Sequence, residues 1–379
     1  ARCSVLQPTV KLPPSALRPE VLPDEALAWF EHVFERDVRA ALPASIFDAR
    51  FTTCSCGAEH ARLSCPLCTS KVHVAPIVRT RGSVRSTRLF RARTGRVVAA
   101  AVEDGRLKHA YEQDGGLLRE DGSTVVRSDA SPELRCRDRV VRIAGNATWI
   151  GARGRFTKIV SGQVCASVPV ANVRGELAGD ASLDGVVHVQ GDVLVRGVDG
   201  TRIGHVLEGQ THVRTSSTLG FAFYRASALT VAFVFDPRRG QLRQVERFPR
   251  IEGKLVDWSA VFDEAHVLLT FACEKNGRVE YAVHLVDARG QLLATDTCAT
   301  SPLAGSLRGR TIAGGAVITA TSDGLVLLRP DRDDRSFVPA RLFPEAKNLV
   351  SPDSELLVGP AGSLYVVDDD EITHLCFTG

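Results

Sequence analysis

The sequence predicts a mainly β fold made of repeated antiparallel sheets, preceded by a short helix and a small cysteine-rich hairpin. Short apolar or alternating segments fill the chain from about residue 97 onward, and turn pairs such as Asp-Gly and Arg-Gly separate them. Helical spacing of apolar residues is clearest after residue 24, and four cysteines fall within residues 54–68. These three observations divide the chain into an arm with a helix, a cysteine hairpin and a large β domain.

Composition limits the class of protein. Hydrophobic residues make up 44% of the 379 residues and charged residues 24%, which is typical of a globular protein with a large core. No apolar run approaches the roughly 18 residues that a membrane-spanning helix needs. The formal net charge is only +3, so we expect local basic patches at most as sites for polyanions.

We expect a cytoplasmic protein. The N-terminal residues lack the apolar core and cleavage site of a signal peptide. Six cysteines outside residues 54–68 lie singly in apolar or strand-like context, which is typical of reduced, buried thiols. A disulfide between Cys273 and Cys298, on neighbouring strands, remains an alternative.

Residues 1–50 are expected to form an extended arm followed by an amphipathic helix. Five prolines punctuate residues 1–23 and favour extended backbone. Asp24 suits the N-cap position, and apolar residues then recur from Leu27 to Val38 at three- and four-residue spacing. The helix should end by Pro43, and docking on its own domain is favoured over binding a partner.

Residues 51–76 contain the strongest chemical signal, two closely spaced pairs of cysteines. Zinc prefers four tetrahedral thiolate or imidazole ligands, and two short pairs on opposing turns supply them. The predicted ligands are Cys54, Cys56, Cys65 and Cys68, with His60 in reserve. The hairpin resembles a compact zinc ribbon, which implies a structural zinc ion. Catalytic zinc would need an open coordination position, and a redox pair would not explain Cys54 and Cys56.

Residues 79–96 hold seven arginines and no acidic residue. Arginines two positions apart lie on one face of a strand, so the segment could contact phosphates or a partner protein. The alternative is a solvent-facing strand whose acidic neighbours lie elsewhere in the fold. The candidate contacts are Arg79, Arg81, Arg85, Arg88, Arg91 and Arg93.

Residues 77–379 show one repeating pattern of hairpins. From Glu120 onward, the intervals between similar hairpins scatter around the 40–50 residues of a four-stranded propeller blade. The pattern resembles a divergent β-propeller of six or seven blades; stacked antiparallel β-sandwiches are the alternative. A closed ring would need the last strand to pair with an early one, for which residues 72–78 are the candidate.

No familiar catalytic motif appears: neither a phosphate-binding loop, a nucleophile elbow nor a dinucleotide fingerprint can be recognised. His188, His205 and His212 alternate with apolar residues as on ordinary strand faces. The acidic run 368–370 and the charged turn 332–335 indicate solvated hairpin tips. Residues from several blades could still meet in a central channel.

These features favour a non-enzymatic scaffold that presents a propeller and a zinc ribbon for protein–protein interaction. The combination is similar in architecture to bacterial accessory proteins that act beside ATPase and von Willebrand A partners, which implies a multi-component system. One alternative is a nucleic-acid-binding protein that uses the ribbon and residues 79–96. A second is a hydrolase or lyase with its site in the propeller channel.

Overall fold

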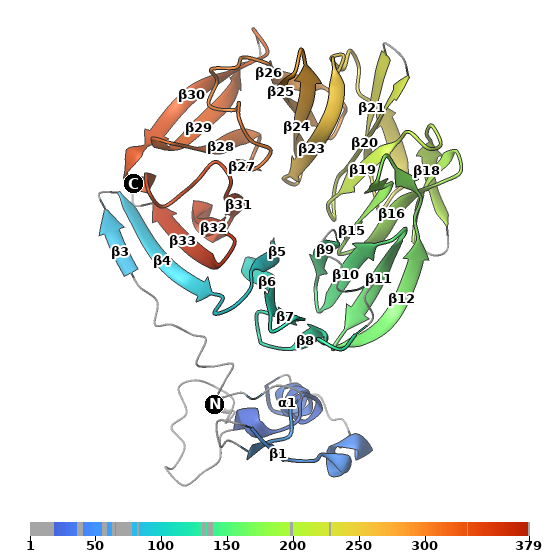
Figure 1. The fold of residues 1–379 in the computed structure, drawn as a ribbon, viewed down its shortest axis with the longest axis vertical. Helices are drawn as coiled ribbons and strands as arrows, with labels where there is room; N and C mark the ends of the chain where they lie inside the picture. Colours follow the sequence, from blue (N-terminus) through green and yellow to red (C-terminus); the bar gives the residue numbers. More distant parts are fainter. Residues whose placement is uncertain are drawn as a thin grey trace.

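The computed structural model forms a ring of seven antiparallel sheets, so the chain is a seven-bladed β-propeller (Figure 1). The first strands of neighbouring blades contact each other around the central channel. This confirms the predicted fold class and excludes the stacked sandwiches. The structure describes residues 19–35, 41–54, 59–62, 65, 78–81, 83–130, 134, 139–197, 200–226, 229–331 and 333–377.

The blades follow one another in chain order, and their strands run from the channel outward. Three blades consist of β5 (Val97–Glu103), β6 (Arg106–Gln113), β7 (Gly116–Arg119) and β8 (Thr124–Val126); β9 (Val140–Ala144), β10 (Ala147–Ala152), β11 (Arg155–Val160) and β12 (Gln163–Pro169); and β15 (Gly179–Ser182), β16 (Gly185–Gln190), β17 (Val193–Arg196) and β18 (Thr201–His205). The small hairpin β13 (Asn172–Val173) and β14 (Glu176–Leu177) lies between the second and third of them.

Three further blades follow in the same order. They consist of β19 (His212–Thr215), β20 (Gly220–Ala226), β21 (Leu229–Asp236) and β22 (Gln241–Gln244); β23 (Lys254–Phe262), β24 (His266–Lys275), β25 (Arg278–Asp287) and β26 (Leu292–Asp296); and β27 (Arg310–Ala313), β28 (Ala316–Thr321), β29 (Gly324–Asp331) and β30 (Ser336–Phe343). Short 3-10 turns at Pro344–Ala346 and Pro360–Gly362 flank the first strand of the closing blade.

The closing blade joins strands from both ends of the described chain. It consists of β31 (Glu355–Val358), β32 (Leu364–Val367), β33 (Glu371–Phe377), β4 (Val84–Arg91) and β3 (Val78–Arg81). Closure by the last strand is as predicted, but the predicted partner is wrong: β33 pairs with β4, and residues 72–77 lie outside the described part. The burial pattern of β4 explains this pairing, because Phe90 is buried opposite Ile372 on the closing strand. In the sequence, the arginines of β4 hide this alternation of buried and exposed residues.

Tight turns connect the strands within a blade, as the sequence predicts. Asp104 and Gly105 join β5 to β6 with φ of 50° and 71°. Both values lie in the left-handed region, which the two-residue turns that suit the twist of a hairpin require. These turn residues therefore set the register of the paired strands, and the register decides which side chains face the core.

The core is divided among the blades. Seven clusters of buried hydrophobic side chains occur, one at each interface between neighbouring blades. The interface between the β19–β22 and β23–β26 blades is the most aromatic, with Phe221, Phe223 and Phe271 fully buried and Trp258 3% exposed. Such large apolar faces hold the blades together without a continuous central core.

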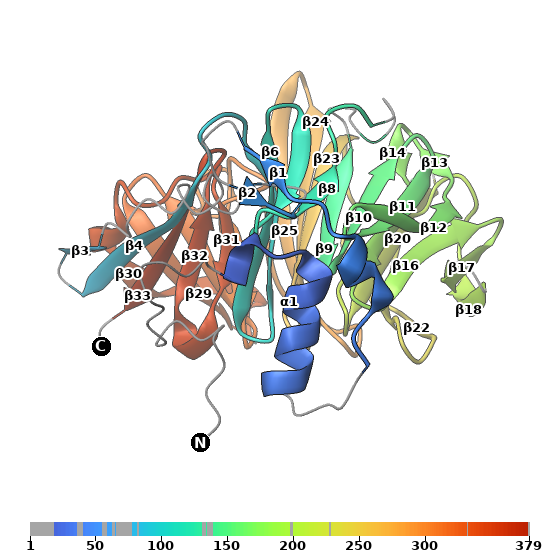
Figure 2. The same ribbon diagram turned by 90° about the horizontal axis from the view of Figure 1, so that it is seen from below.

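The N-terminal module lies outside the ring, beside the edge that carries β7 and β8 (Figure 1), and Figure 2 shows α1 from below the ring. Its elements are a 3-10 turn (Pro19–Val21), α1 (Asp24–Phe30), a π-helical turn (Glu31–Glu35), a 3-10 turn (Ala44–Asp48), β1 (Thr52–Thr53) and β2 (Glu59–His60). The helix begins at Asp24, as predicted. Trp29 contacts the rings of Phe30 and Phe34, and its Nε1 donates to the Ala41 carbonyl at 3.1 Å.

All six cysteines in the described part are free thiols. Cys273 is buried and Cys298 is exposed, so the disulfide considered between them does not form. Burial raises the pKa of the Cys273 thiol, which keeps it protonated. Among the described helices, none is long and apolar enough to cross a membrane.

Candidate functional site

In the part of the chain that the structure describes, we consider two groups of polar side chains, a cysteine–histidine cluster in the N-terminal module and a network at one end of the propeller channel. In the module, the β1–β2 pair places Cys54 directly after β1 and His60 at the end of β2. Cys65 completes a cluster whose ligand atoms all lie within 4.8 Å of one another. His60 and Cys65 are buried.

This donor set fits a metal ion. Tetrahedral zinc holds sulfur at about 2.3 Å and nitrogen at about 2.0–2.1 Å, which places its ligand atoms roughly 3.5–3.8 Å apart. The three donors therefore lie close to the separation of ligands around one ion. Cys54 and Cys65 are predicted ligands, and His60 is the predicted reserve ligand. The other two predicted ligands, Cys56 and Cys68, lie outside the described residues.

Which ring nitrogen of His60 carries the proton depends on whether a metal is bound. The Arg62 amide lies 3.3 Å from His60 Nδ1 and donates to it, so the neutral ring carries its proton on Nε2. A metal on Nδ1 would take the accepting lone pair, and a metal on Nε2 would move the proton to Nδ1. Metal binding and this hydrogen bond therefore exclude each other.

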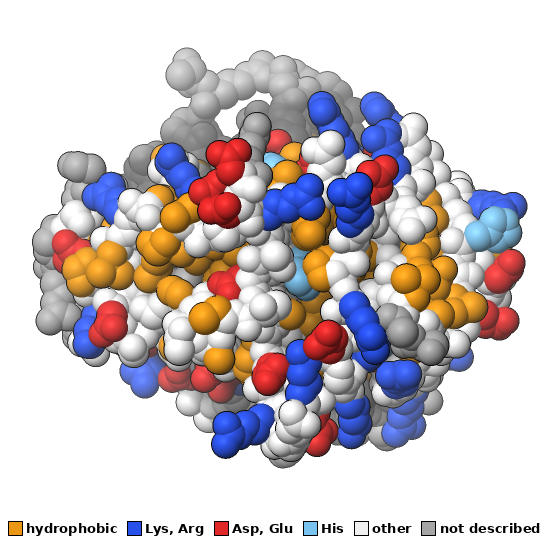
Figure 3. All heavy atoms as spheres, turned by 90° about the horizontal axis from the view of Figure 1, so that it is seen from above, with side chains coloured by type: hydrophobic (Ala, Val, Ile, Leu, Met, Phe, Trp, Pro, Cys, Tyr) orange, Lys and Arg blue, Asp and Glu red, His pale blue; other side chains and the backbone are white. Residues whose placement is uncertain are grey.

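The predicted basic segment has acidic neighbours on the closing strand. Arg88 lies 3.6 Å from Glu371, and Arg91 lies 3.3 Å from Asp370. Arg79 and Arg81 lie on β3, whereas Arg85 and Arg93 are exposed. Local pairing is what the alternative interpretation, a solvent-facing strand, predicts. The side of the molecule in Figure 3 likewise carries both signs of charge.

At the channel, the Glu176 carboxylate joins the β13–β14 hairpin to two blades. It lies on β14, before the β15–β18 blade, and accepts hydrogen bonds from His212 Nδ1 at 2.9 Å and Trp258 Nε1 at 3.1 Å. Arg214 donates to its other oxygen, and the Arg214 guanidinium also lies 4.8 Å from the Trp258 ring centre. His212 in turn stacks on Phe223 with ring centres 4.8 Å apart. The carboxylate therefore links β14, β19 and β23.

These donors set the charge state of Glu176. Burial alone would raise the pKa of the carboxyl group, but the bonds from His212 and Trp258 and the charge of Arg214 outweigh it. Together they lower the pKa to about 2. Glu176 is consequently ionised at neutral pH, and all its close partners are donors, which makes it a structural link between blades.

A second carboxylate strengthens the same end of the channel. Asp180 on β15 accepts from Arg142 Nε on β9 at 2.8 Å and from the Thr215 amide on β19 at 3.2 Å. Its side chain is almost fully buried. The first strands of three consecutive blades are thus held in register by side-chain bonds as well as by packing.

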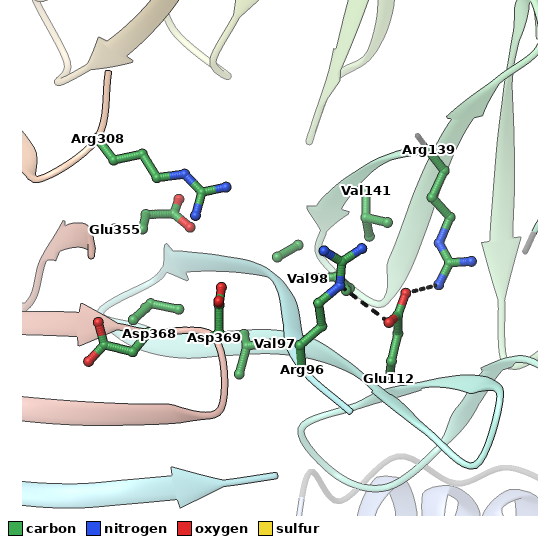
Figure 4. A pocket seen from close by; sticks show the side chains of 12 residues that line it. Arg96, Val97, Val98, Glu112, Arg139, Val141, Arg308, Glu355, Asp368 and Asp369 are labelled. Atoms are coloured by element: carbon green, nitrogen blue, oxygen red, sulfur yellow. Dashed lines mark hydrogen bonds and ion pairs between the residues drawn. The ribbon is translucent and has the colours of Figure 1, made fainter. Parts of the chain in front are cut away.

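Next to this network lies a cavity of about 260 Å³, where β5, β9 and β31 begin (Figure 4). Its charged lining comprises Arg96, Glu112, Arg139, Arg308, Glu355, Asp368 and Asp369. Glu112 binds two of the arginines, Arg96 at 3.3 Å and Arg139 at 2.9 Å. The cavity is therefore a polar chamber built by residues from distant parts of the sequence.

Two glycines allow the cavity wall to form. Gly95, before Arg96, has φ of 98°, and a Cβ there would lie 2.3 Å from the Glu112 carbonyl oxygen. Gly309, after Arg308, has φ of 72°, and its Cβ would lie 2.3 Å from the Pro352 carbonyl oxygen. Only glycine fits both positions, so these residues fix the backbone that carries the two arginines.

Sequence reasoning missed the channel residues. One signal was available: an arginine stands just before the first strand of three blades, as Arg96, Arg139 and Arg308. The acidic run 368–370 forms the turn between β32 and β33, with Asp369 and Asp370 exposed as expected of a hairpin tip. In addition, Asp368 and Asp369 line the cavity, and Asp368 accepts from Ser354 Oγ at 2.6 Å.

The three histidines have separate surroundings. His205 is exposed and lies 3.3 Å from Asp192, while His188 is buried and burial lowers its pKa. His212 is correctly placed on a strand but, contrary to the expectation of an ordinary strand face, it belongs to the Glu176 network. The three histidines are therefore close in sequence but do not form one site.

Comparison with known proteins finds distantly similar solved structures but no related sequence. No protein-family model and no curated protein sequence matches the chain. Solved structures that resemble it include a streptogramin B lyase (12% identity, TM-score 0.44, 78% of this chain and 98% of that one). An oligogalacturonate lyase from Vibrio parahaemolyticus matches at 10% identity (TM-score 0.44, 79% and 96%). An extracellular domain of a hybrid two component system from B. thetaiotaomicron also resembles the chain (9% identity, TM-score 0.43, 79% of this chain and 43% of that one).

Proposed function

We propose that this chain is a non-enzymatic scaffold for protein–protein interaction, in which a zinc-stabilised N-terminal module presents the main contact surface and the propeller serves as a rigid platform. We place it in a multi-component bacterial system in the cytoplasm. Free thiols throughout the described part agree with a reducing compartment. The zinc ion would be held by Cys54, His60 and Cys65, with Cys56 or Cys68 as a fourth ligand.

The observation that carries this proposal is a concentration of exposed apolar side chains in the module. Phe34, Leu42, Phe47 and Phe51 expose 52%, 41%, 77% and 51% of their surfaces. Burying one such side chain in an interface contributes about 1.5–3 kcal/mol. Exposed aromatic groups of this kind mark surfaces that bind other proteins.

The metal cluster supports a role in presenting these side chains. Phe51 directly precedes β1, and Cys54 directly follows it. The Ala61 amide donates to the Val21 carbonyl at 2.8 Å and ties the hairpin to the start of the module. A zinc ion at Cys54 and His60 would therefore fix the direction in which the Phe47–Phe51 segment projects.

The two alternatives have less support. Nucleic-acid binding would use arginines of which Arg88 and Arg91 already have acidic partners. A hydrolase or lyase in the channel would have to use a network in which Glu176 is saturated with donors. The lyases among the similar structures carry no argument for activity at this level of similarity.

Site-specific photo-crosslinking can test the scaffold role. A photoreactive residue at Phe47 in the native host should label one discrete partner, and the purified partner should then bind the purified chain in a titration. We expect Phe47→Ser to weaken that binding about tenfold, because one buried aromatic side chain contributes over 1.4 kcal/mol. Leu183, which is 54% exposed on a propeller hairpin, supplies the matched control Leu183→Ser. Equal labelling from position 183, or unchanged affinity of Phe47→Ser, would contradict the proposal.

A further inference from the structure

One outer strand of the propeller has an open edge that the scaffold role does not use. β12 is the outermost strand of its blade and lies on the rim of the ring (Figure 1). Among the described residues it pairs with β11 only, along one of its two edges. An open edge presents backbone N–H and C=O groups that can pair with a strand of another chain.

β12 lacks the features that usually prevent such pairing. Natural edge strands are blocked by charged residues, by an interior proline or by being very short. β12 has seven residues, none of them charged, and its one proline is the last residue. The other outermost strands are protected: β3 carries Arg79 and Arg81, β18 Arg202, β22 Arg243, β26 Asp296 and β30 Arg341, whereas β8 is a short strand that ends in buried valines.

The register shows which backbone groups of β12 point outward. The Val170 amide donates to the Gly154 carbonyl at 2.8 Å, which marks these two residues as a hydrogen-bonded pair. Hydrogen-bonded and non-hydrogen-bonded pairs alternate along antiparallel strands. Ser167, opposite Thr157, therefore belongs to a non-hydrogen-bonded pair, and its N–H and C=O point away from β11. Pro169 occupies the same kind of position, where its missing N–H costs no bond to β11.

The side chains along this edge are uncharged and partly apolar. Val164 is 60% exposed, and the Cys165 thiol is also exposed. On the neighbouring strand β11, Lys158 reaches inward, with its Nζ 5.8 Å from the Trp149 ring centre. Arg155 is exposed but lies opposite the last residue of β12. The middle of the edge therefore meets a second strand without an intervening charge.

We propose that β12 pairs with β12 of a second copy of this chain, antiparallel about a two-fold axis, so that two blades join into one continuous sheet. In such a pair the strand faces itself, and a charged residue would lie near its own copy and be repelled. An edge that recognised a different protein would gain from opposite charges on the two partners, whereas self-pairing favours an uncharged strand. β12 meets this condition, and the arginines of β18, β22 and β30 do not.

The pair would be weak by itself, because one strand edge buries less surface than the interface of a stable complex. We expect a dissociation constant of about 10–100 µM. The dimer would carry two N-terminal modules, and a partner with two binding sites would then be held more tightly than by a single chain. This consequence rests on the scaffold role, whereas the dimer itself does not.

Analytical ultracentrifugation of the full chain tests the pairing. The mass should rise from 40.9 kDa toward twice that value as the protein concentration increases from about 2 to 200 µM. Ser167→Pro removes an outward N–H and leaves the bonds to β11 intact, so it should weaken the dimer at least about tenfold. Ser167→Ala keeps the N–H and is the matched control, which should dimerise like the original protein.

Val164→Lys provides a second test if Ser167→Pro does not fold, because it places two like charges at the edge. Circular dichroism and melting temperature will show that each variant remains folded. A short bismaleimide should also link two copies through Cys165, so Cys165→Ser should abolish the covalent dimer and Cys298→Ser, at another exposed thiol, should not.

Three results would overturn the proposal: a monomer at every concentration, a dimer that both edge variants leave unchanged, or a covalent dimer that survives Cys165→Ser. None of them bears on the scaffold role, because the test of that role uses Phe47 in the N-terminal module. Conversely, loss of partner binding in Phe47→Ser leaves the mass of the dimer unchanged.

Discussion

At the scale of single residues, Glu176 shows how one carboxylate can couple several blades. It lies in a two-residue strand between blades, where it accepts from His212, Arg214 and Trp258. Its pKa of about 2 is far below the ordinary value of 4.5. A group whose pKa is lowered in the folded state stabilises that state above the unfolded pKa, and this contribution is lost as pH falls toward the folded pKa.

We therefore expect Glu176→Gln to lower the free energy of unfolding at pH 7 by about 3 kcal/mol, the equivalent of the whole pKa shift. The difference between the variant and the original protein should shrink as pH falls from about 4.5 toward 2, because both then carry a neutral side chain. Urea unfolding across this range measures it. Glu246→Gln, at an exposed position, is the control, and a pH-independent difference for Glu176→Gln would show that charge is not the cause.

The sequence could predict the candidate metal ligands of the module because their spacing is local. Cys54, His60 and Cys65 fall within a short hairpin, so the pattern and the geometry coincide. Glu176 and Glu355 could not be found in the same way. Their partners come from β19, β23, β9 and the residues before β27, and only the closed ring brings these together.

At the scale of elements, the pairing of β33 with β4 holds the ring closed. Seven residue pairs connect the two strands, and the register places Cys376 opposite Arg85. Opposite residues of antiparallel strands have Cβ atoms about 4.5–5.5 Å apart, close to the separation in a disulfide. Cys376 is a free, half-buried thiol.

This register makes a covalent lock testable. We expect Arg85→Cys to form a disulfide with Cys376 under mild oxidation and to raise the free energy of unfolding by about 2–4 kcal/mol, because the bond constrains the unfolded chain. Unfolding with and without reductant gives the measurement. Arg85→Ser is the control for loss of the arginine. If the oxidised variant carries no disulfide, or if its stability matches that of the reduced form, the register of β33 against β4 is wrong.

Hairpins are also the elements that the sequence predicts best. Turn residues such as Asp104-Gly105 specify left-handed backbone, and the alternating strands on either side follow from them. The number of blades was left open at six or seven, because the intervals vary and β13–β14 adds a hairpin outside the blades. The partner of the closing strand was assigned wrongly because β4 is rich in arginine, although its alternate residues are buried.

At the scale of the whole molecule, the N-terminal module and the propeller use different means of stabilisation. The propeller has seven hydrophobic clusters, whereas the module has a short helix, a two-residue strand pair and the cysteine–histidine cluster. A hairpin of this size is not stable without additional bonds. A metal ion bound by this cluster should therefore stabilise the module alone.

We expect the purified chain to contain about one zinc ion, and Cys54→Ser and Cys65→Ser to lose it. Elemental analysis measures the metal content, and circular dichroism should show that the β structure of the ring survives, because no cluster residue belongs to its cores. Cys165→Ser, at an exposed site on the propeller, should retain the metal. Zinc content unaffected by both Cys54→Ser and Cys65→Ser would place the ion elsewhere.

Closure of the ring by β33 also has a consequence for protein synthesis. The ribosome makes β4 long before β33, so the edge of β4 that faces β33 stays without its partner through most of translation. An unpaired strand edge readily pairs with the wrong strand or with another chain. The exposed arginines along β4 oppose such contacts through like-charge repulsion, and Glu371 and Asp370 meet Arg88 and Arg91 only when the final strand arrives. The arginines of β4 would then protect the nascent chain from wrong pairing before they form ion pairs in the folded protein.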